Sequence, residues 1–303
     1  MGGDSLKPDP FKIPTYVINM KERPDRWRLF LEELGAAAGA LKIHRVAAQN
    51  GKLLDPLKDR RISTHTRLNI LRNDRRTHRE IATLGAIGCS ISHGIAWRRV
   101  LASGAPWAII MEDDARPDMA ALAAAAAAAP SLPADAKIWL LGYYKPNLVY
   151  EPAPAAARSP WSTAYQFTAS HAYMISREAA KTLLEQLYPI ESHVDHYISA
   201  MSVLYGLKMV VHDAVYVPFG GLLEKKGSPR AIESNTSQHR KDGCSACHVP
   251  DHLSRFYQRV GPKTRCGRAV RGLKLEGQQP REVLTYRRNG TKRSGKTRRL
   301  ERL

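Results

Sequence analysis

Short apolar runs alternate along residues 13–217 with segments in which apolar side chains recur every three or four positions. The short runs are typical of buried strands, and the longer spacing is typical of helices with one apolar face. Because this alternation indicates strands joined by crossover helices, the pattern predicts an α/β fold with a mostly parallel sheet. The expected strands cover residues 15–20, 43–47, 107–111, 138–141, 172–175 and 210–217, the last one broken around residues 212–213.

The expected helices carry their own start and stop signals. The first begins near Pro24, which is favoured in a first helical turn, and ends at Gly35. The alanine tract at residues 120–129 is predicted to be a helix ended by Pro130. Two further helices are expected from apolar stripes, one formed by Ile87, Ile91, Ile95, Val100 and Leu101 and the other by Ala179, Ala180, Leu183, Leu184 and Leu187.

Composition narrows the class of protein. With 303 residues, of which 43% are hydrophobic, the chain can bury a core, and disorder throughout is excluded. No run of 18 apolar residues occurs, and the N-terminus lacks the apolar stretch of a signal peptide, so no transmembrane segment is expected. Four cysteines are too few for a disulfide framework in a chain of this length. These features predict a cytoplasmic protein, and they are compatible with peripheral association with a membrane surface.

Positive charge is concentrated in two regions of a chain whose formal charge is +19. Residues 52–80 are rich in arginine and are predicted to form a long surface excursion. Residues 261–303 contain 14 Lys and Arg against 3 Asp and Glu, a composition that predicts a disordered tail. We therefore expect an N-terminal extension at residues 1–12, an enzyme domain at 13–237, and a Cys/His-containing segment with the basic tail at 238–303.

Three consecutive acids, Glu112, Asp113 and Asp114, follow the expected strand at residues 107–111. Ligands of open α/β sheets bind at the carboxyl ends of strands, and neighbouring carboxylates repel unless a cation offsets their charge. A divalent cation such as Mg²⁺ or Mn²⁺ takes oxygen ligands and leaves positions for phosphate. In an extended segment Glu112 and Asp114 would share that ligand while Asp113 faces elsewhere. The alternative is a solvated acidic turn capping a helix that begins near Pro117.

Several ordered segments combine residues in a recognisable pattern. They are YVINMKERPDRW from residue 16, AAQNG from residue 47, GAIGCSISHGIAW from residue 85, AIIMEDDARP from residue 108, HAYMISREAAKTLL from residue 171 and PIESHVDHYI from residue 189. Together they resemble glycosyltransferase family 25, the group of bacterial lipopolysaccharide galactosyltransferases and procollagen galactosyltransferases. The segments at residues 85–97 and 108–117 carry the most specific part of this resemblance.

The resemblance implies a GT-A-like fold, with a single Rossmann-like mixed sheet flanked by helices. It also implies a UDP-sugar donor, with galactose or glucose as the sugar, and a glycan or protein acceptor. Mn²⁺ or Mg²⁺ would assist the transfer, which would invert the anomeric carbon. Such a cation, with basic side chains, neutralises charge that develops on a departing diphosphate.

The resemblance also assigns candidate residues to each role. Glu112 and Asp114 are the expected metal ligands, and Asp195 is the expected catalytic base, with Glu191 and His171 as alternatives. The residues expected to contact the donor are Asn19, Arg23, Arg26, Asn50, Gly88, Ser92, His93 and Asp113, with Asn50 in place of the family's acid. Several of these have simpler interpretations: Asp195 as a helix-capping carboxylate, His93 as a hydrogen-bonded packing residue, and Arg26 as a surface arginine.

The C-terminal part carries competing signals. Cys244, Cys247 and His248 match the attachment motif of c-type haem, and the same residues with Cys266, His239 or His252 could bind zinc or remain free. The basic tail could contact nucleic acid, an anionic membrane surface or an acidic glycan. Two other hypotheses follow, a nucleic-acid-associated protein whose α/β domain has lost catalysis and a non-catalytic protein that binds sugar nucleotides.

Overall fold

The computed structural model describes residues 7–73, 75, 77, 79–150 and 159–220. The predicted cysteine and histidine motif at residues 239–266, the basic tail and the expected domain boundary at residue 237 all lie outside the described residues. The haem, zinc, nucleic-acid and tail hypotheses therefore stay predictions.

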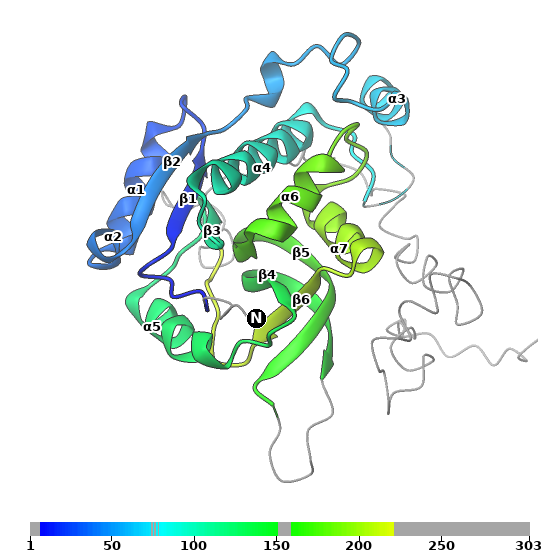
Figure 1. Cartoon of the computed structure of the whole chain (residues 1–303). Coiled ribbons are helices and arrows are strands. Elements are labelled where there is room, and N and C mark those ends of the chain that lie inside the picture. Colours follow the sequence, from blue (N-terminus) through cyan, green and yellow to red (C-terminus); the bar gives the residue numbers. More distant parts are fainter. Residues whose placement is uncertain (1–6, 74, 76, 78, 151–158, 221–303) are drawn as a thin grey trace, which may run out of the picture.

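The core of the fold is one six-stranded sheet with the strand order β2-β1-β3-β5-β4-β6 (Figure 1). β1 pairs in parallel with both β2 and β3, and β4 pairs in parallel with β6, whereas β5 is antiparallel to β3, β4 and β6. The strand bounds are Pro14–Asn19 for β1, Lys42–Ala47 for β2, Trp107–Glu112 for β3, Ala136–Tyr150 for β4, Trp161–Ser176 for β5 and Lys208–His212 for β6.

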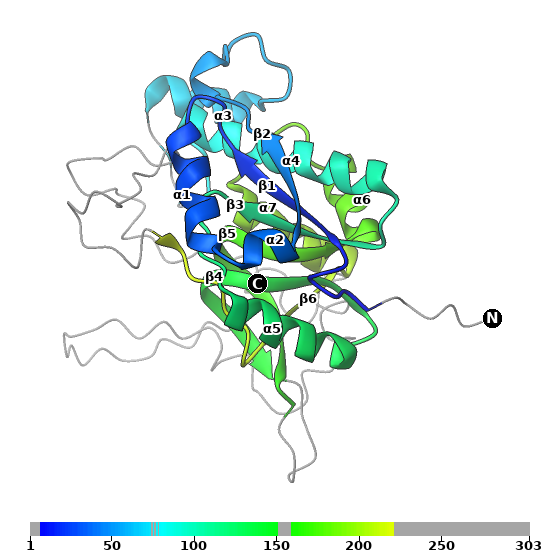
Figure 2. The same cartoon turned by 90° about the vertical axis from the view of Figure 1, so that its left-hand side faces the viewer.

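Helices cover both faces of this sheet, as Figures 1 and 2 show. α4, α6 and α7 pack on one face, and α1, α2 and α5 pack on the other. The helix bounds are Pro24–Leu34 for α1, Ala37–Ala40 for α2, Thr64–Arg72 for α3, Leu84–Ser103 for α4, Met119–Ala128 for α5, Arg177–Glu185 for α6 and Val194–Tyr205 for α7. Two 3-10 turns, η1 at Gly51–Leu53 and η2 at Ala129–Ser131, complete the elements.

Alternation along the buried strands explains the two layers. Successive residues of a strand point to opposite faces, so Ile18 and Ile110 join the core beneath α4 while Val17 and Ile109 join the core beneath α1 and α5. All four are buried. A strand covered on both faces has to be apolar throughout, which is why these strands read as continuous apolar runs.

The α/β class and the single mixed sheet are confirmed. The sheet is also mostly parallel, as expected, because β2, β1, β3, β4 and β6 run in one direction and, of the six described strands, β5 alone runs against them. β4 and β5 form an antiparallel pair of 15 and 16 residues, much longer than the apolar runs at 138–141 and 172–175. The surface excursion at residues 52–80 contains α3, which was not expected; it is anchored by the buried Ile62, whose backbone pairs with Ile190.

The helix signals are mostly confirmed. Pro24 opens α1, Gly35 follows its end, and the alanine tract forms α5, which passes into a 3-10 turn at Pro130. Asp118 caps α5 by accepting a hydrogen bond from the backbone N–H of Ala121 at 2.7 Å. Among the described residues, no helix combines the length and apolar character needed to cross a bilayer.

Candidate active site

The order in which successive strands are added to the sheet reverses at β1. β1 lies between β2 and β3; α1, on the way from β1 to β2, covers one face, and α4, which precedes β3, covers the other. A reversal of this kind makes the carboxyl ends of β1 and β3 a topological switch point, the usual place for a ligand in open α/β sheets. Asn19 ends β1 and Glu112 ends β3, so the acidic cluster stands at this point.

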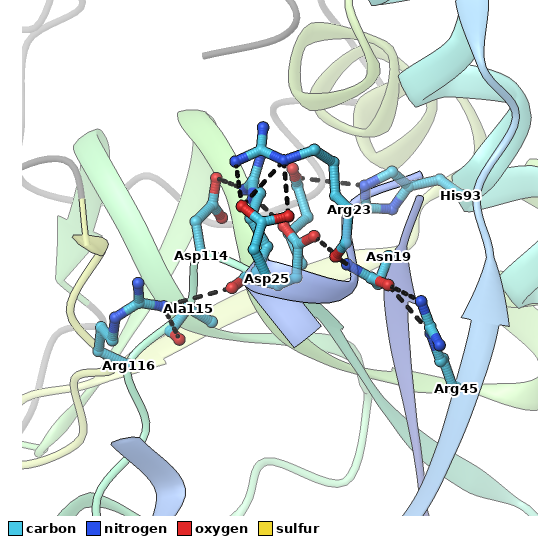
Figure 3. A network of polar contacts seen from close by, with 11 residues as sticks. Asn19, Arg23, Asp25, Arg45, His93, Asp114, Ala115 and Arg116 are labelled. Atoms are coloured by element: carbon cyan, nitrogen blue, oxygen red, sulfur yellow. Dashed lines mark hydrogen bonds and ion pairs between the residues drawn. The ribbon is translucent and has the colours of Figure 1, made fainter. Parts of the chain in front are cut away.

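A buried guanidinium holds two of the three acids, one of which is Asp114, labelled in Figure 3. Arg26 of α1 forms an ion pair with Asp113 and a second one with Asp114 at 3.0 Å. Asn19 donates from Nδ2 to Asp113 at 2.6 Å, while its own Oδ1 accepts from Arg45 of β2. Charges removed from water need such pairing, and here one arginine spans both aspartates.

This network corrects two expectations. Arg26 is only 7% exposed, so the surface interpretation is wrong. Asp113 does not face away from Asp114, because β3 ends at Glu112 and the next two residues form a turn in which strand alternation no longer applies. The solvated-turn interpretation is also wrong, because the acids are largely buried and the residue that caps α5 is Asp118.

Glu112 is held by a different set of partners. Its Oε1 accepts a hydrogen bond from the Ser170 hydroxyl at 2.9 Å and lies 3.4 Å from Nε2 of His93. The other ring nitrogen of His93 is 2.8 Å from the hydroxyl of Tyr173, which in turn accepts from Trp97 Nε1 at 2.9 Å. His93, Tyr173 and Trp97 are all fully buried.

The direction of these hydrogen bonds follows from the donors available. An indole N–H can only donate, so the Tyr173 oxygen accepts from Trp97. Among the described residues, His93 Nδ1 is then the acceptor for the tyrosine's own hydrogen. A neutral His93 therefore carries its hydrogen on Nε2, which points it toward Glu112. This series of hydrogen bonds, from Trp97 through Tyr173 to His93, thus presents an N–H donor to the carboxylate of Glu112 and fixes the orientation of that carboxylate.

The neighbouring acids have different proton affinities. Burial raises the pKa of Glu112, but the hydrogen bonds from His93 and Ser170, with the positive charge of the histidines, outweigh it and lower the pKa to about 2. Burial and the charges of Glu112 and Asp113 raise the pKa of Asp114 to about 7. Burial also raises the pKa of Asp113. Carboxyl pairs whose pKa values are pushed apart are typical of catalytic and binding sites.

One carboxylate oxygen at the site has no partner. Asp114 Oδ1 is buried and accepts no hydrogen bond among the described residues, whereas Oδ2 faces Arg26. Leaving a buried carboxylate oxygen unpaired is costly, and a hard cation would remove that cost. Oxygen ligands from Asp114 and Glu112 match the preference of Mg²⁺ and Mn²⁺. The two residues expected to hold a metal thus fit such an ion.

A softer metal fits less well. Cys89, His93 and Glu112 place one ligand atom each within 4.8 Å of the others. Burial, together with the charges of Glu112, Asp195 and Asp114, raises the pKa of the Cys89 thiol well above its usual value. A thiol that stays protonated is a poor metal ligand. The donor set therefore favours a cation held by carboxylate oxygens.

Comparison with known protein families decides the assignment. The model of glycosyltransferase family 25, described as an LPS biosynthesis protein family, matches residues 12–198. This chain belongs to glycosyltransferase family 25. The match covers the acidic cluster, Arg26, His93 and Asp195, and it identifies the chain as a glycosyltransferase with a GT-A-like fold. A search of curated proteins gave no match to the chain.

The candidate bases of this family 25 domain occupy three different environments. Asp195, in the first turn of α7, accepts from the backbone N–H of Ala169 at 3.0 Å, and its charge acts on the same Cys89 thiol as Glu112 and Asp114 do. His171 is buried, donates from Nε2 to the carbonyl of Val217 at 2.8 Å, and its pKa is lowered by burial. Glu191 lines a separate cavity beside α3, with none of the acidic cluster in its wall.

Several residues that were expected to contact the sugar donor have packing or capping roles within the domain. A Cβ on Gly88 would lie 2.6 Å from the carbonyl oxygen of Gln49, so the glycine lets α4 approach this loop closely. Ser92 accepts from the Gln49 N–H at 2.9 Å, and Asn50 caps η1. Their contact with a donor stays a prediction.

Arg23 is paired on the outside of the family 25 site. It forms an ion pair with Asp25 at 2.7 Å, which Figure 3 shows, and its charge also acts on Asp113 of the acidic cluster. This interaction lowers the pKa of Asp25 to about 2. A donor that reached Arg23 would therefore compete with an existing carboxylate.

Sequence reasoning missed four residues that build the site: Arg45, Trp97, Ser170 and Tyr173. Trp97 and Tyr173 stand inside two of the segments that carry the family resemblance, at residues 85–97 and 171–184, so position alone could have suggested them. Ser170 precedes His171 and lies beside Ala169, whose backbone has a positive φ of 66°. No sequence signal marks Arg45, because its role depends on β2 pairing beside β1.

Proposed function

We propose that this family 25 enzyme is an inverting, metal-dependent hexosyltransferase. It moves galactose or glucose from a UDP-sugar to a hydroxyl of a glycan or protein acceptor. The observation that carries the proposal is the unpaired, buried Oδ1 of Asp114 beside Glu112, at the switch point of the sheet. We also infer a cytoplasmic location, which is supported by the small number of cysteines.

The chain's own residues prepare the site for a diphosphate. Glu112, held by Ser170 and His93, and Asp114 would supply carboxylate oxygens to Mn²⁺ or Mg²⁺. When bound, that ion stabilises negative charge on the departing nucleotide. Arg26 keeps Asp113 and Asp114 side by side, which limits reorganisation during the reaction.

The base that deprotonates the acceptor is Asp195 in this proposal. Inversion by a single displacement needs a base on the face opposite the leaving group. Asp195 is half-buried, so an acceptor hydroxyl can approach it, whereas His171 is only 2% exposed. The backbone N–H groups of Ala169 and His196 donate to its two oxygens and fix the orientation of the carboxylate.

The proposal is tested by measuring UDP release from UDP-galactose and UDP-glucose with Mn²⁺, with Mg²⁺ and with EDTA. We expect cation-dependent release that Asp114→Asn reduces about 10²–10³-fold, the size of effect seen when one electrostatic contact to a leaving group is lost. Asp118→Asn is the matched control, because Asn caps a helix as well as Asp does. Equal release in EDTA, or an unaffected Asp114→Asn variant, would contradict the metal site.

The stereochemical part has its own test. The anomeric configuration of the transferred sugar, read by proton NMR of the product, must be opposite to that of the donor. Retention would overturn the role given to Asp195 while leaving the metal site intact.

A further inference from the structure

Exposed leucines gather in one segment of the molecule. Eight large apolar side chains are exposed among the described residues, and four of them fall between residues 53 and 71. They are Leu53, Leu57, Leu68 and Leu71, with 74%, 62%, 42% and 57% of their surface exposed. Single exposed leucines are ordinary, but a group of them in one segment indicates a surface that binds something apolar.

The segment forms one end of the molecule. In Figure 1, η1, α3 and the residues between them lie beyond α4, on the side of that helix away from the sheet. Leu68 and Leu71 are three residues apart on α3, so they share a face of that helix. The buried Thr66 instead donates to the carbonyl of Ile190 at 3.1 Å and holds α3 to the domain. The leucines thus project from an anchored support.

Basic residues alternate with the leucines along this segment of the sequence. Residues 52–73 contain six basic side chains and two acids. Both acids are paired locally, Asp55 with Lys58 and Asp59 with Arg61. Basic side chains interleaved with exposed leucines are the composition of segments that lie in the headgroup layer of an anionic bilayer.

A cavity of about 460 Å³ opens within the same segment. Arg60, His65 and Arg67 contribute to its wall, with Glu191 as its one acid. The Nε of Arg67 is buried and has no hydrogen-bond partner among the described residues. A phosphate group is the kind of anion that two guanidinium groups accept.

We propose that residues 52–72 form a docking surface for an anionic lipid bilayer. The four leucines enter the headgroup region, the surrounding Lys and Arg side chains contact lipid phosphates, and the cavity beside α3 receives one phosphate. The chain's own basic tail is a poor occupant of this surface, because residues 261–303 carry the same sign of charge. An enzyme docked in this way would act on acceptors held at a membrane.

The test is co-sedimentation of the full chain with vesicles of phosphatidylcholine alone and with phosphatidylglycerol mixed in. We expect binding only to the mixed vesicles, weakened by added salt, and at least tenfold weaker in the variant Leu53→Ser/Leu57→Ser/Leu68→Ser/Leu71→Ser. Leu204→Ser/Tyr205→Ser is the matched control, since both residues are about half exposed on α7, at 51% and 49%. A second variant, Arg60→Gln/Arg67→Gln, should lower binding without removing leucines.

Other outcomes identify other occupants. Equal binding of the leucine variant and the parent chain would assign any membrane contact to the tail and overturn the proposal. No binding to either vesicle, or a dimer in light scattering that the leucine variant loses, would overturn it as well. UDP release without vesicles should be the same in all these variants, so a failure here is distinct from a failure of the proposed function.

Discussion

Replacing Asp114 with Asn should make the metal-free protein more stable while removing its activity. Asp114 is largely buried beside Glu112 and Asp113, and its pKa is raised from 3.8 to about 7, first by burial and then by those two charges. A carboxyl whose pKa is raised in the folded state binds its proton more tightly there than in the unfolded chain. Its ionisation therefore destabilises the fold as pH rises above 3.8, and the penalty stops growing above pH 7.

The size of the effect follows from the shift. A rise from 3.8 to about 7 corresponds to a penalty of about 4 kcal/mol at pH 8. Asn carries no charge and avoids this penalty, and the attraction of Arg26 needs no separate subtraction because it is already included in the raised pKa of Asp114. The net gain expected at pH 8 is therefore about 4 kcal/mol. At pH 5, only about one unit above the pKa of an unfolded aspartate, the gain should fall to about 1.6 kcal/mol.

Urea unfolding in EDTA at pH 5, 6.5 and 8 measures this directly. Asp118→Asn serves again as the control and should leave the free energy of unfolding unchanged at each pH. Adding Mn²⁺ should stabilise the parent chain at pH 8 and leave Asp114→Asn unchanged, because the variant has lost a ligand. The reasoning is refuted if Asp114→Asn is destabilised at pH 8, or if its effect does not vary with pH.

Three further predictions concern the surroundings of the acidic cluster. Tyr173→Phe removes the hydroxyl that hydrogen-bonds His93, so it should cost about 1–3 kcal/mol of stability and let His93 adopt both tautomers. A nitrogen NMR spectrum of this variant with hydrogen on Nε2 alone would contradict the role given to the Tyr173 hydroxyl. Gly88→Ala places a Cβ 2.6 Å from a backbone carbonyl oxygen and should cost about 1–3 kcal/mol in thermal unfolding, whereas Gly39→Ala, with nothing within 4 Å, should not destabilise. Mn²⁺ affinity should fall about tenfold per pH unit below 7, where Asp114 must lose a proton to bind, and stay level above it; a calorimetric profile without this bend would exclude Asp114 as a ligand.

The parts of the fold that sequence predicts well are those buried on both faces. β1 and β3 are apolar runs bounded by polar residues, so their existence and their ends could be read directly. The full lengths of β4 and β5 could not be predicted from the sequence. Outside their short apolar runs, these strands are defined by pairing with each other, and the local sequence pattern does not show that pairing. α3 was missed for the same reason, since its support comes from contacts with Ile190, far along the chain.

The candidate site divides along similar lines. The acids and Asn19 were found because they stand at strand ends, where topology brings residues together. Arg26 was expected to contact the sugar donor, but its role as the partner of the acids was not predicted, because nothing local shows that a side chain in the first turn of α1 pairs with the residues that follow β3. The alternation rule failed at Asp113 because a turn begins there.

The three acids are built for three different tasks, and this difference argues for a bound cation. Glu112 is held by Ser170 and His93, which keep its pKa low, and Asp113 is paired with Arg26 and accepts a hydrogen bond from Asn19. Asp114 shares the same arginine but keeps one buried oxygen with no partner among the described residues. The two buried guanidinium groups that act on Asp114, those of Arg26 and Arg116, do not offset three carboxylates, so one negative charge remains when Asp114 is ionised. A divalent cation balances that excess, and it also explains why a fold would keep a carboxyl that destabilises it at neutral pH.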